Sequence, residues 1–290
     1  MGGGNISVLS KNIAEEKTLL RKKLDNLYDL LKKYLSDGII IAFSGGVDSA
    51  FLLWAAKETQ EREGGKLLAL TAHSPSLPKV DLDDAVGLAG TLGVEHKIVE
   101  SHEFELEEYL RNDLFRCYHC KKELFRLSGD IAETEHYKWI IYGYNATDKD
   151  DFRPGHKAAL ENDILAPLAR VDLTKDEIRE TLRANGLNLS DKPSSPCLSS
   201  RIMTGIPITE KRLRDVEFME NIIRESGIKI FRVRLCQEEG LDFLRIETQP
   251  QDMSKIIELR ERLVEEGTKR GYRWVTLDLA GYKMGGGNRE

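Results

Sequence analysis

Apolar residues recur at steps of three and four positions between residues 19 and 35, and charged or polar residues fill most positions between them. This spacing predicts an amphipathic helix that ends near residues 37–38, where an aspartate precedes a glycine. The next residues, 39–43, form a continuous apolar run and predict a buried strand. After a glycine-containing turn, we expect a helix from residue 49 to the glycine pair at 64–65.

The same alternation of short apolar runs and helical spacing continues to residue 185. We expect further strands at 66–72, 94–99, 139–143 and 164–168, and helices at 79–92, 103–136 and 174–185. Strands that alternate with helices of this length are typical of α/β folds, in which helices cover both faces of a parallel sheet.

Residues 186–208 differ from the preceding part because they contain three prolines and five serines, which predicts a loop or linker. Beyond it we expect helices at 209–226 and 251–268 and strands at 229–236, 241–248 and 272–279, with adjacent antiparallel strands. The pattern therefore predicts two domains, an α/β domain over residues 1–190 and a smaller α+β domain over residues 191–290.

The charge balance argues against a general nucleic-acid-binding protein, because the net charge is −6 at pH 7. No apolar run approaches the ~20 residues that a membrane span needs, and the first residues lack the order of a secretion signal. We therefore expect a cytoplasmic protein without membrane or nucleic-acid partners. In this setting the four cysteines favour metal binding or catalysis over a disulfide framework.

The turn after the first predicted strand reads SGGVDS, residues 44–49. Glycines let backbone N–H groups approach an anion, the following helix N-terminus adds partial positive charge, and Ser44 and Ser49 offer hydroxyls. These features suit a phosphate. The alternative is a tight strand-to-helix turn with serine capping. The lysine-containing GxxxxGK[ST] loop and the GxGxxG pattern are both absent.

The SGGVDS string resembles the loop of the PP-loop ATP pyrophosphatases. The resemblance implies that the loop binds pyrophosphate and that ATP is cleaved between its α and β phosphates, which adenylates a substrate oxygen. Two further loops follow the second and fourth strands, at the sheet edge where ligands gather in open parallel sheets. The ATP-binding residues predicted in this way are Ser44, Gly45, Gly46, Asp48, Ser49, Thr71, Ala72, His73, Ser74, Gly143, Asn145 and Asp148.

An acidic cluster in the third of these loops offers oxygen ligands for Mg²⁺, which prefers carboxylates and phosphate oxygens. It consists of Asp148, Asp150 and Asp151. The alternative is a solvated acidic loop.

Three cysteines lie in two short motifs. Cys117 and Cys120 form a C-x-x-C pair, and Cys197 lies 77 residues after Cys120 in SSPCLSSR. Three thiolates can hold three irons of a [4Fe–4S] cluster and leave the fourth iron open. Zinc with His119 or Cys236 as fourth ligand, a reducible Cys117–Cys120 pair, and ordinary buried thiols are the alternatives that spacing leaves open.

Taken together, SGGVDS (44–49), GYNATDKDDFRPG (143–155), SSPCLSSRI (194–202), FRVRL (231–235) and VTLDLAGY (275–282) resemble the LarE family of ATP-dependent sulfur transferases. The resemblance implies that a carboxylate of pyridinium-3,5-biscarboxylic acid mononucleotide is adenylated and becomes a thiocarboxylate during nickel-pincer nucleotide biosynthesis. One LarE type gives up the sulfur of a cysteine at the Cys197 position. Another carries a [4Fe–4S] cluster on three cysteines. This chain has Cys117 and Cys120 as well and resembles the cluster type.

The resemblance also implies catalytic roles for Asp48, Cys197, Ser200, Arg201 and Glu220, and it implies ATP, Mg²⁺ and the cluster as cofactors. Its partners would be the nucleotide substrate and a sulfide donor, and we expect a homo-oligomer. The chain departs from the family pattern at residues 283–287, where KMGGG replaces the usual arginine and Gly-Ser pattern.

Arginines alternate with apolar residues in the predicted strand at 231–236, so Arg232, Arg234 and Cys236 share one face. Two guanidinium groups ~7 Å apart on such a face can bind a phosphate. Arg201 is a further candidate, Glu220 and Asp252 match carboxylates of the family's second domain, and we interpret Cys236 as a bystander. The alternative for the two arginines is a solvated face with surface ion pairs.

Two other enzymatic functions fit a PP-loop protein. A tRNA thiolation enzyme also combines this loop with three cysteines but needs a basic RNA-binding surface, and an amidotransferase-like synthetase needs no cysteine trio. A third class, a nucleotide sensor without catalytic activity, would bind ATP without releasing pyrophosphate.

Overall fold

The computed structural model describes residues 4–150, 154–187, 189 and 196–283, without the side chains of residues 4–14 and 150. Contacts divide the chain into two units. Unit 1 comprises residues 1–72, 83–99 and 124–192, and unit 2 comprises residues 73–82, 100–123 and 193–290. The predicted domain boundary at residue 190 stays a prediction. No helix in the described ranges is long and apolar enough to cross a membrane.

Unit 1 is built on a four-stranded sheet in the order β3-β2-β1-β4. Its strands are β1 (Ile39–Ala42), β2 (Leu67–His73), β3 (Glu95–Glu100) and β4 (Trp139–Tyr142). The central strand β1 pairs in parallel with β2 on one side and with β4 on the other. All four residues of β1 are buried, which agrees with the uninterrupted apolar run and confirms the predicted α/β class.

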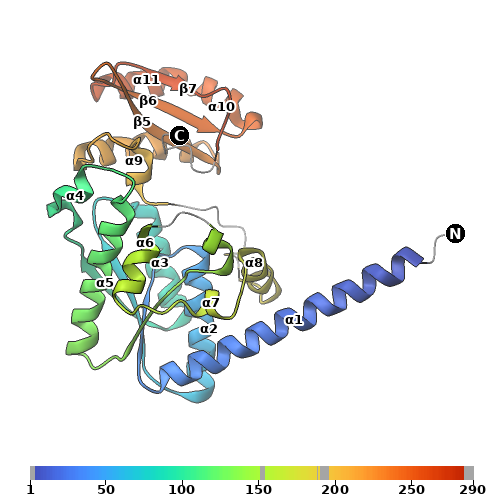
Figure 1. Cartoon of the computed structure of the whole chain (residues 1–290). Coiled ribbons are helices and arrows are strands. Elements are labelled where there is room, and N and C mark those ends of the chain that lie inside the picture. Colours follow the sequence, from blue (N-terminus) through green and yellow to red (C-terminus); the bar gives the residue numbers. More distant parts are fainter. Residues whose placement is uncertain (1–3, 151–153, 188, 190–195, 284–290) are drawn as a thin grey trace. The chain divides into compact units, whose positions relative to one another are not determined.

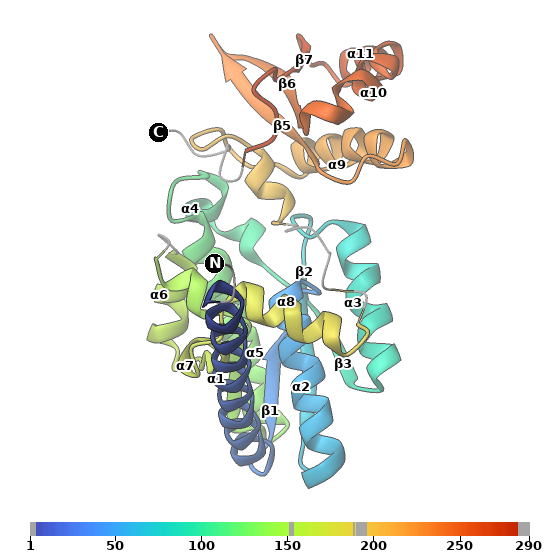
Figure 2. The same ribbon diagram turned by 90° about the vertical axis from the view of Figure 1, so that its right-hand side faces the viewer.

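Helices cover both faces of this sheet. The helices α1 (Gly4–Leu35), α2 (Val47–Glu63) and α8 (Lys175–Ala184) lie next to one another, as Figure 2 shows. Ile39 and Ile41 pack into the core beneath them, together with residues of α3 (Lys79–Leu92). Ile40 points to the opposite face, where it packs near Ala132 of α5 (Arg116–Thr134). Because successive side chains of β1 point to opposite faces of the sheet, the strand contributes to a hydrophobic core on each face.

The predicted strand at 164–168 is wrong. Leu165 forms only an isolated parallel bridge with Ile141, and Pro167 begins the short helix α7 (Pro167–Arg170). Proline lacks the N–H that a central strand donates, and its fixed φ suits the first turn of a helix. The predicted helix at 103–136 is also interrupted. It consists of η1 (Glu103–Glu105), α4 (Glu107–Leu110) and α5, and Asn112 between them has a positive φ of 57°.

Two short helices follow β4 in unit 1. They are η2 (Ala146–Asp150), which begins three residues after the strand, and α6 (Pro154–Glu161). Further along the chain, η3 (Leu198–Arg201) begins directly after Cys197 in unit 2.

Unit 2 contains a three-stranded sheet in the order β5-β6-β7, drawn in orange and red in Figure 1. Its elements are α9 (Glu210–Glu225), β5 (Phe231–Glu238), β6 (Leu241–Thr248), η4 (Pro250–Asp252), α10 (Met253–Glu258), α11 (Arg260–Lys269) and β7 (Val275–Leu277). The strands β5 and β6 are antiparallel as predicted, whereas β7 runs parallel to β6. The sheet is therefore mixed.

The segment 100–123 belongs to the core of unit 2. Tyr109 is 1% exposed and packs in the same cluster as Val233 of β5, and its hydroxyl lies 2.6 Å from that of Ser199. The buried Asn112 amide donates to the carbonyl oxygens of Met203 and Ile206 at 3.0 and 2.8 Å. These bonds join the segment that carries Cys117 and Cys120 to the segment that follows Cys197.

Candidate functional site

The SGGVDS loop connects β1 to α2 and is held by its own serines. The Ser49 hydroxyl donates to the Gly46 carbonyl at 3.0 Å and accepts from the Ser44 N–H at 3.3 Å. The Ser44 hydroxyl lies 3.2 Å from that of Ser49, and Gly45 has a φ of +67°, which favours glycine. The loop therefore has a fixed backbone that ends at the N-terminus of α2, where an anion is favoured.

The end of β4 packs directly against this loop. A Cβ atom on Gly143 would lie 2.7 Å from the Ser49 backbone nitrogen and 2.9 Å from the Asp48 carbonyl carbon, so only glycine allows this approach. Asn145 is fully buried, its backbone N–H donates to the Asp148 carboxylate at 3.2 Å, and its side-chain Oδ1 accepts from the Thr147 N–H at 2.9 Å. Its Nδ2 has no hydrogen-bond partner among the described residues.

The acidic residues of this region have different surroundings. One carboxylate oxygen of Asp48 lies 3.1 Å from the Lys175 ammonium, and the other is buried without a hydrogen-bond partner in the described part of the chain. Asp148 is buried. Asp151 lies outside the described residues, as does the side chain of Asp150, so the predicted magnesium cluster is described only at Asp148.

The predicted ATP-binding residues at the end of β2 have different surroundings. The Thr71 hydroxyl donates to the Phe43 carbonyl at 2.7 Å and lies 2.8 Å from Nε2 of His96, whose pKa is lowered by burial. Ala72 is half-buried, and His73 is exposed. Thr71 therefore ties the carboxyl end of β2 to β1 through its side chain.

Ser74 belongs to a buried network in unit 2. The hydroxyls of Ser74 and Ser76 donate to one carboxylate oxygen of Glu103 at 2.6 and 3.0 Å, and the Ser101 hydroxyl donates to the other. Glu103 is 2% exposed. Sequence reasoning missed this carboxylate, because nothing local distinguishes Glu103 from the exposed acidic residues around it.

The three cysteines of the predicted cluster all lie in unit 2. Cys117 is exposed as a whole residue, and Cys120 and Cys197 are half-buried. Burial of the thiol and the neighbouring Cys197 raise the pKa of Cys117, and the Arg116 guanidinium opposes this. Burial and then Glu103 and Cys197 raise the pKa of Cys120. Cys197 therefore lies close enough to both thiols of the C-x-x-C pair to affect their pKa values.

These thiols do not form a ready-made ligand set. Among the described residues, no group of three or more His, Cys, Asp or Glu side chains is placed to hold a metal ion. Cys236 is buried on β5, and burial raises the pKa of its thiol.

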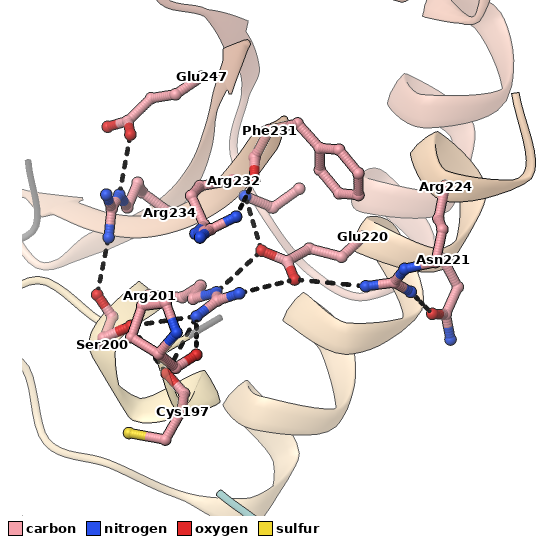
Figure 3. Close-up of polar contacts among 12 residues, drawn as sticks. Cys197, Ser200, Arg201, Glu220, Asn221, Arg224, Phe231, Arg232, Arg234 and Glu247 are labelled. Carbon is pink, nitrogen blue, oxygen red and sulfur yellow. Dashed lines mark hydrogen bonds and ion pairs between the residues drawn. The ribbon is translucent and has the colours of Figure 1, made fainter. Parts of the chain in front are cut away.

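Arginines around η3 form a buried cluster, shown in Figure 3. Arg201 donates to both carboxylate oxygens of Glu220, at 3.0 and 3.3 Å, and both side chains are 2% exposed. The same guanidinium donates to the Cys197 carbonyl and the Ser200 hydroxyl, each at 3.2 Å. The segment that begins at Cys197 is thereby fixed to α9.

Arg234 joins the same segment to β6. Its guanidinium donates to Glu247 at 3.1 Å and to the Ser200 carbonyl at 2.9 Å. Glu247 was not predicted as a site residue, although it lies opposite Arg232 in the register of β5 and β6.

Arg232 completes the cluster. It donates to the Phe231 carbonyl at 2.6 Å and lies over the Tyr282 ring at 5.2 Å. Burial, followed by repulsion from Arg201, lowers its pKa. Arg232 and Arg234 are 7% and 4% exposed, so the alternative of a solvated face with surface ion pairs does not hold. Asp252 pairs with Lys255 at 3.3 Å.

Comparisons with known proteins place the chain in a superfamily. No protein-family model matches it. It is 38% identical over 274 residues to an uncharacterized protein of Synechocystis, which covers 93% of this chain and 98% of that protein. It is 28% identical over 247 residues to the pyridinium-3,5-bisthiocarboxylic acid mononucleotide synthase of Lactiplantibacillus plantarum, covering 85% and 87% of the two chains. It is 28% identical over 208 residues to a tRNA-specific 2-thiouridylase of Syntrophus aciditrophicus, covering 60% and 54%.

With its parallel sheet and its SGGVDS loop, the chain belongs to the PP-loop ATP pyrophosphatase superfamily, in one family with the Synechocystis protein. Its characterised relatives are ATP-dependent enzymes, so the fold and loop imply ATP use. Within the superfamily, its similarity to the L. plantarum synthase is moderate and extends over most of both chains.

Proposed function

We propose that this protein is an ATP-dependent sulfur transferase that adenylates a carboxylate of pyridinium-3,5-biscarboxylic acid mononucleotide and converts it to a thiocarboxylate. The observation that carries the proposal is the buried cluster of Arg201, Arg232 and Arg234 around the short helix that begins after Cys197. The similarity to the L. plantarum synthase supports the same conclusion.

Two of the three arginines are paired with buried carboxylates. Arg201 pairs with Glu220, and Arg234 pairs with Glu247. Buried charges are costly unless they are paired. A dianionic phosphate monoester on Arg232 and Arg234 would be held by charge-assisted hydrogen bonds.

The loop residues supply the activation step. ATP binds with its β and γ phosphates on the backbone of residues 44–49, and the substrate carboxylate attacks the α phosphorus. Pyrophosphate leaves and an acyl-adenylate forms, in which AMP replaces a poor leaving oxygen. Sulfide then attacks the acyl carbon, a C–S bond forms, and the C–O bond to AMP breaks. Asp48 and Asp148 are the carboxylates of the described loops that could hold Mg²⁺.

Cys117, Cys120 and Cys197 are the residues that would hold a [4Fe–4S] cluster. Cys197 contributes to the raised pKa of Cys117 and of Cys120, and Arg116 contributes a positive charge beside Cys117 and Cys197. Three thiols within one unit are the donor type that such a cluster takes, although the described residues do not form a converged ligand set. A bound cluster with an open iron would supply sulfide next to the substrate.

The test is ATP–pyrophosphate exchange by the anaerobically purified protein, with and without the mononucleotide. We expect exchange that depends on the substrate, is abolished by Asp48→Ala and persists in Cys197→Ala, which should lose only thiocarboxylate formation. A brown protein with about four irons supports the cluster, whereas a colourless protein with one zinc contradicts it. Lack of exchange with the mononucleotide, together with a gel shift of bulk tRNA, would favour tRNA thiolation instead.

A further inference from the structure

The buried arginines of unit 2 have different kinds of neighbours. Arg201 and Arg234 each donate to a buried carboxylate. The Arg232 guanidinium lies over an aromatic ring, with its carbon atom 5.2 Å from the centroid of Tyr282. Arg232 is 7% exposed, so this contact lies in the interior of the unit. Cation–π contacts are strongest where they are removed from water.

The backbone of Tyr282 is fixed to the end of the strand pair that carries Arg232. The Tyr282 N–H donates to the Thr248 carbonyl at 2.9 Å. Thr248 is fully buried, and it pairs with Phe231, the residue before Arg232, in the register of β5 and β6. The position of the ring beside Arg232 is therefore set by the sheet itself.

The glycine before Tyr282 allows this close approach. Gly281 has a φ of +76°, and a Cβ atom there would lie 2.9 Å from the Thr248 carbonyl oxygen. The Gly281 N–H donates to the Asp278 carbonyl at 3.1 Å, and the Asp278 N–H donates to the Ile246 carbonyl at 2.8 Å. Residues 278–282 thus form a turn that is bonded to β6 at both of its ends.

An aromatic ring holds a guanidinium group differently from a carboxylate. A carboxylate neutralises the positive charge and accepts the N–H groups, and Arg234 is held in this way by Glu247. A ring attracts the cation through its π electrons and leaves the net charge in place. A guanidinium group held over a ring therefore keeps the charge that attracts a phosphate monoester, and its planar N–H groups can bind two phosphate oxygens.

We propose that Tyr282 is a positioning residue whose ring orients the Arg232 guanidinium for the phosphate group of the substrate. The inference rests on the phosphate binding that the proposed function assigns to Arg232 and Arg234. Because the ring acts through Arg232, its removal should weaken the binding of the phosphate without affecting the chemical step. We therefore expect a higher KM for the mononucleotide and an unchanged kcat.

The test is calorimetric titration of Tyr282→Leu and Tyr282→Phe with the pyridinium mononucleotide and with the corresponding nucleoside, which lacks the phosphate. Loss of the ring should weaken mononucleotide binding by about threefold to thirtyfold. Nucleoside binding should change by less than about twofold. Phenylalanine keeps an aromatic ring at this position, so Tyr282→Phe should retain most of the affinity for the mononucleotide.

The matched control is Trp274→Leu. Trp274 is 46% exposed, and Arg273 lies over its ring at 5.5 Å, so this variant removes a cation–π contact at the surface of the same unit. Both affinities should stay unchanged. The coupling to Arg232 is measured separately. In the Arg232→Ala background, Tyr282→Leu should cause no further loss of affinity, because the ring then has no guanidinium group to orient.

Equal losses for the mononucleotide and the nucleoside in Tyr282→Leu would overturn the inference, because the ring would then support the fold rather than the phosphate site. Losses that add in the double variant would also overturn it, since the ring would then act independently of Arg232. Failure of the proposed function is distinguishable by titration with ribose 5-phosphate.

If the unchanged protein binds ribose 5-phosphate but not the pyridinium mononucleotide, the proposed function fails. The inference is then supported by a loss of ribose 5-phosphate affinity in Tyr282→Leu of about threefold to thirtyfold, and it is overturned by an unchanged affinity. Binding of neither compound by the unchanged protein would overturn both proposals.

Discussion

At the scale of single residues, the site of unit 2 is dominated by charges removed from water. The Arg201–Glu220 and Arg234–Glu247 pairs are both buried, and Glu220 also accepts the Val233 N–H at 3.2 Å. Removing one member of a buried pair costs more stability than the intact pair contributes. The reason is that the remaining charge stays buried with neither solvent nor a partner. The pairs therefore hold the segment after Cys197 in place.

The helix α9 offers a direct comparison of a buried and an exposed carboxylate. We expect Glu220→Ala to lower the free energy of unfolding by about 3–5 kcal/mol, because Arg201 is left unpaired in the interior. Glu225→Ala in the same helix removes a carboxylate that is 62% exposed and lies 3.1 Å from Arg262, so the loss should be about 0–1 kcal/mol. Urea denaturation of the two variants measures both values, and similar losses would contradict the role assigned to Glu220.

The sequence predicted which residues of β5 share a face but not that the face is buried. Successive side chains of a strand point to opposite faces, so the shared face of Arg232 and Arg234 follows from their spacing in the sequence alone. The burial of Arg234 depends on Ser200 and Glu247, which approach from other parts of the chain. Charged residues in a strand are usually exposed, and only tertiary contacts reverse that expectation.

At the scale of elements, the conformation of the SGGVDS loop depends on how closely β4 approaches it. In Gly143→Ala the added methyl group would lie 2.7 Å from the Ser49 nitrogen, which forces the loop backbone to move. Overpacking of this kind costs about 1–3 kcal/mol, and we expect ATP affinity to fall about fivefold or more. Calorimetric titration with Mg–ATP measures the change.

The control for this variant is Gly87→Ala in α3. A Cβ atom there meets nothing within 4 Å, and alanine is the better helix former, so stability should rise by about 0.5–1 kcal/mol without a change in ATP affinity. Normal ATP binding by Gly143→Ala would show that the loop tolerates displacement.

The capping box of α8 makes the start of this helix sensitive to acid. Burial tends to raise the pKa of Glu177, but bonds from Lys23 and Thr174 outweigh it, and the net pKa lies below its usual 4.5. A lowered pKa stabilises the fold above about pH 4.5, and the contribution is lost as the pH falls through the lower folded value. Melting temperatures of the unchanged protein and of Glu177→Gln should therefore differ at pH 6 and converge toward pH 3.

Glu180→Gln provides the comparison, because Glu180 is an exposed residue of the same helix. Its melting temperature should equal that of the unchanged protein between pH 3 and pH 6. A difference in melting temperature between Glu177→Gln and the unchanged protein that does not depend on pH would contradict the stabilising role of the ionised Glu177 carboxylate.

Most elements were predictable from the sequence because their signals are local. The apolar run of β1, the glycines that flank α2 and the alternation in β6 gave bounds within a few residues of the observed ones. The exception at 164–168 shows the limit, because an apolar run there includes Pro167, and the choice between strand and helix depended on that one residue. The parallel pairing of β7 was not predictable, since it depends on the path of α10 and α11.

At the scale of the whole molecule, residues distant in sequence complete each unit. We expect a fragment of residues 191–290 to lack cooperative unfolding, because it loses the buried Tyr109 and the Asn112 bonds to Met203 and Ile206. Thermal denaturation followed by circular dichroism, with the full chain as reference, provides the measurement. A sharp transition in the fragment alone would support a domain boundary at residue 190.

Unit 2 is built from separate segments of the chain, and this affects whether its cysteines and arginines are inherited together. Cys117 and Cys120 are encoded 80 and 77 codons before Cys197, with a large part of unit 1 between them, yet all three belong to one unit. A single recombination event near residue 190 would combine a cysteine pair from one parent with the third cysteine and the arginines from another. Chimaeras between relatives should therefore show the proposed sulfur transfer only when residues 100–123 stay with their own C-terminal segment.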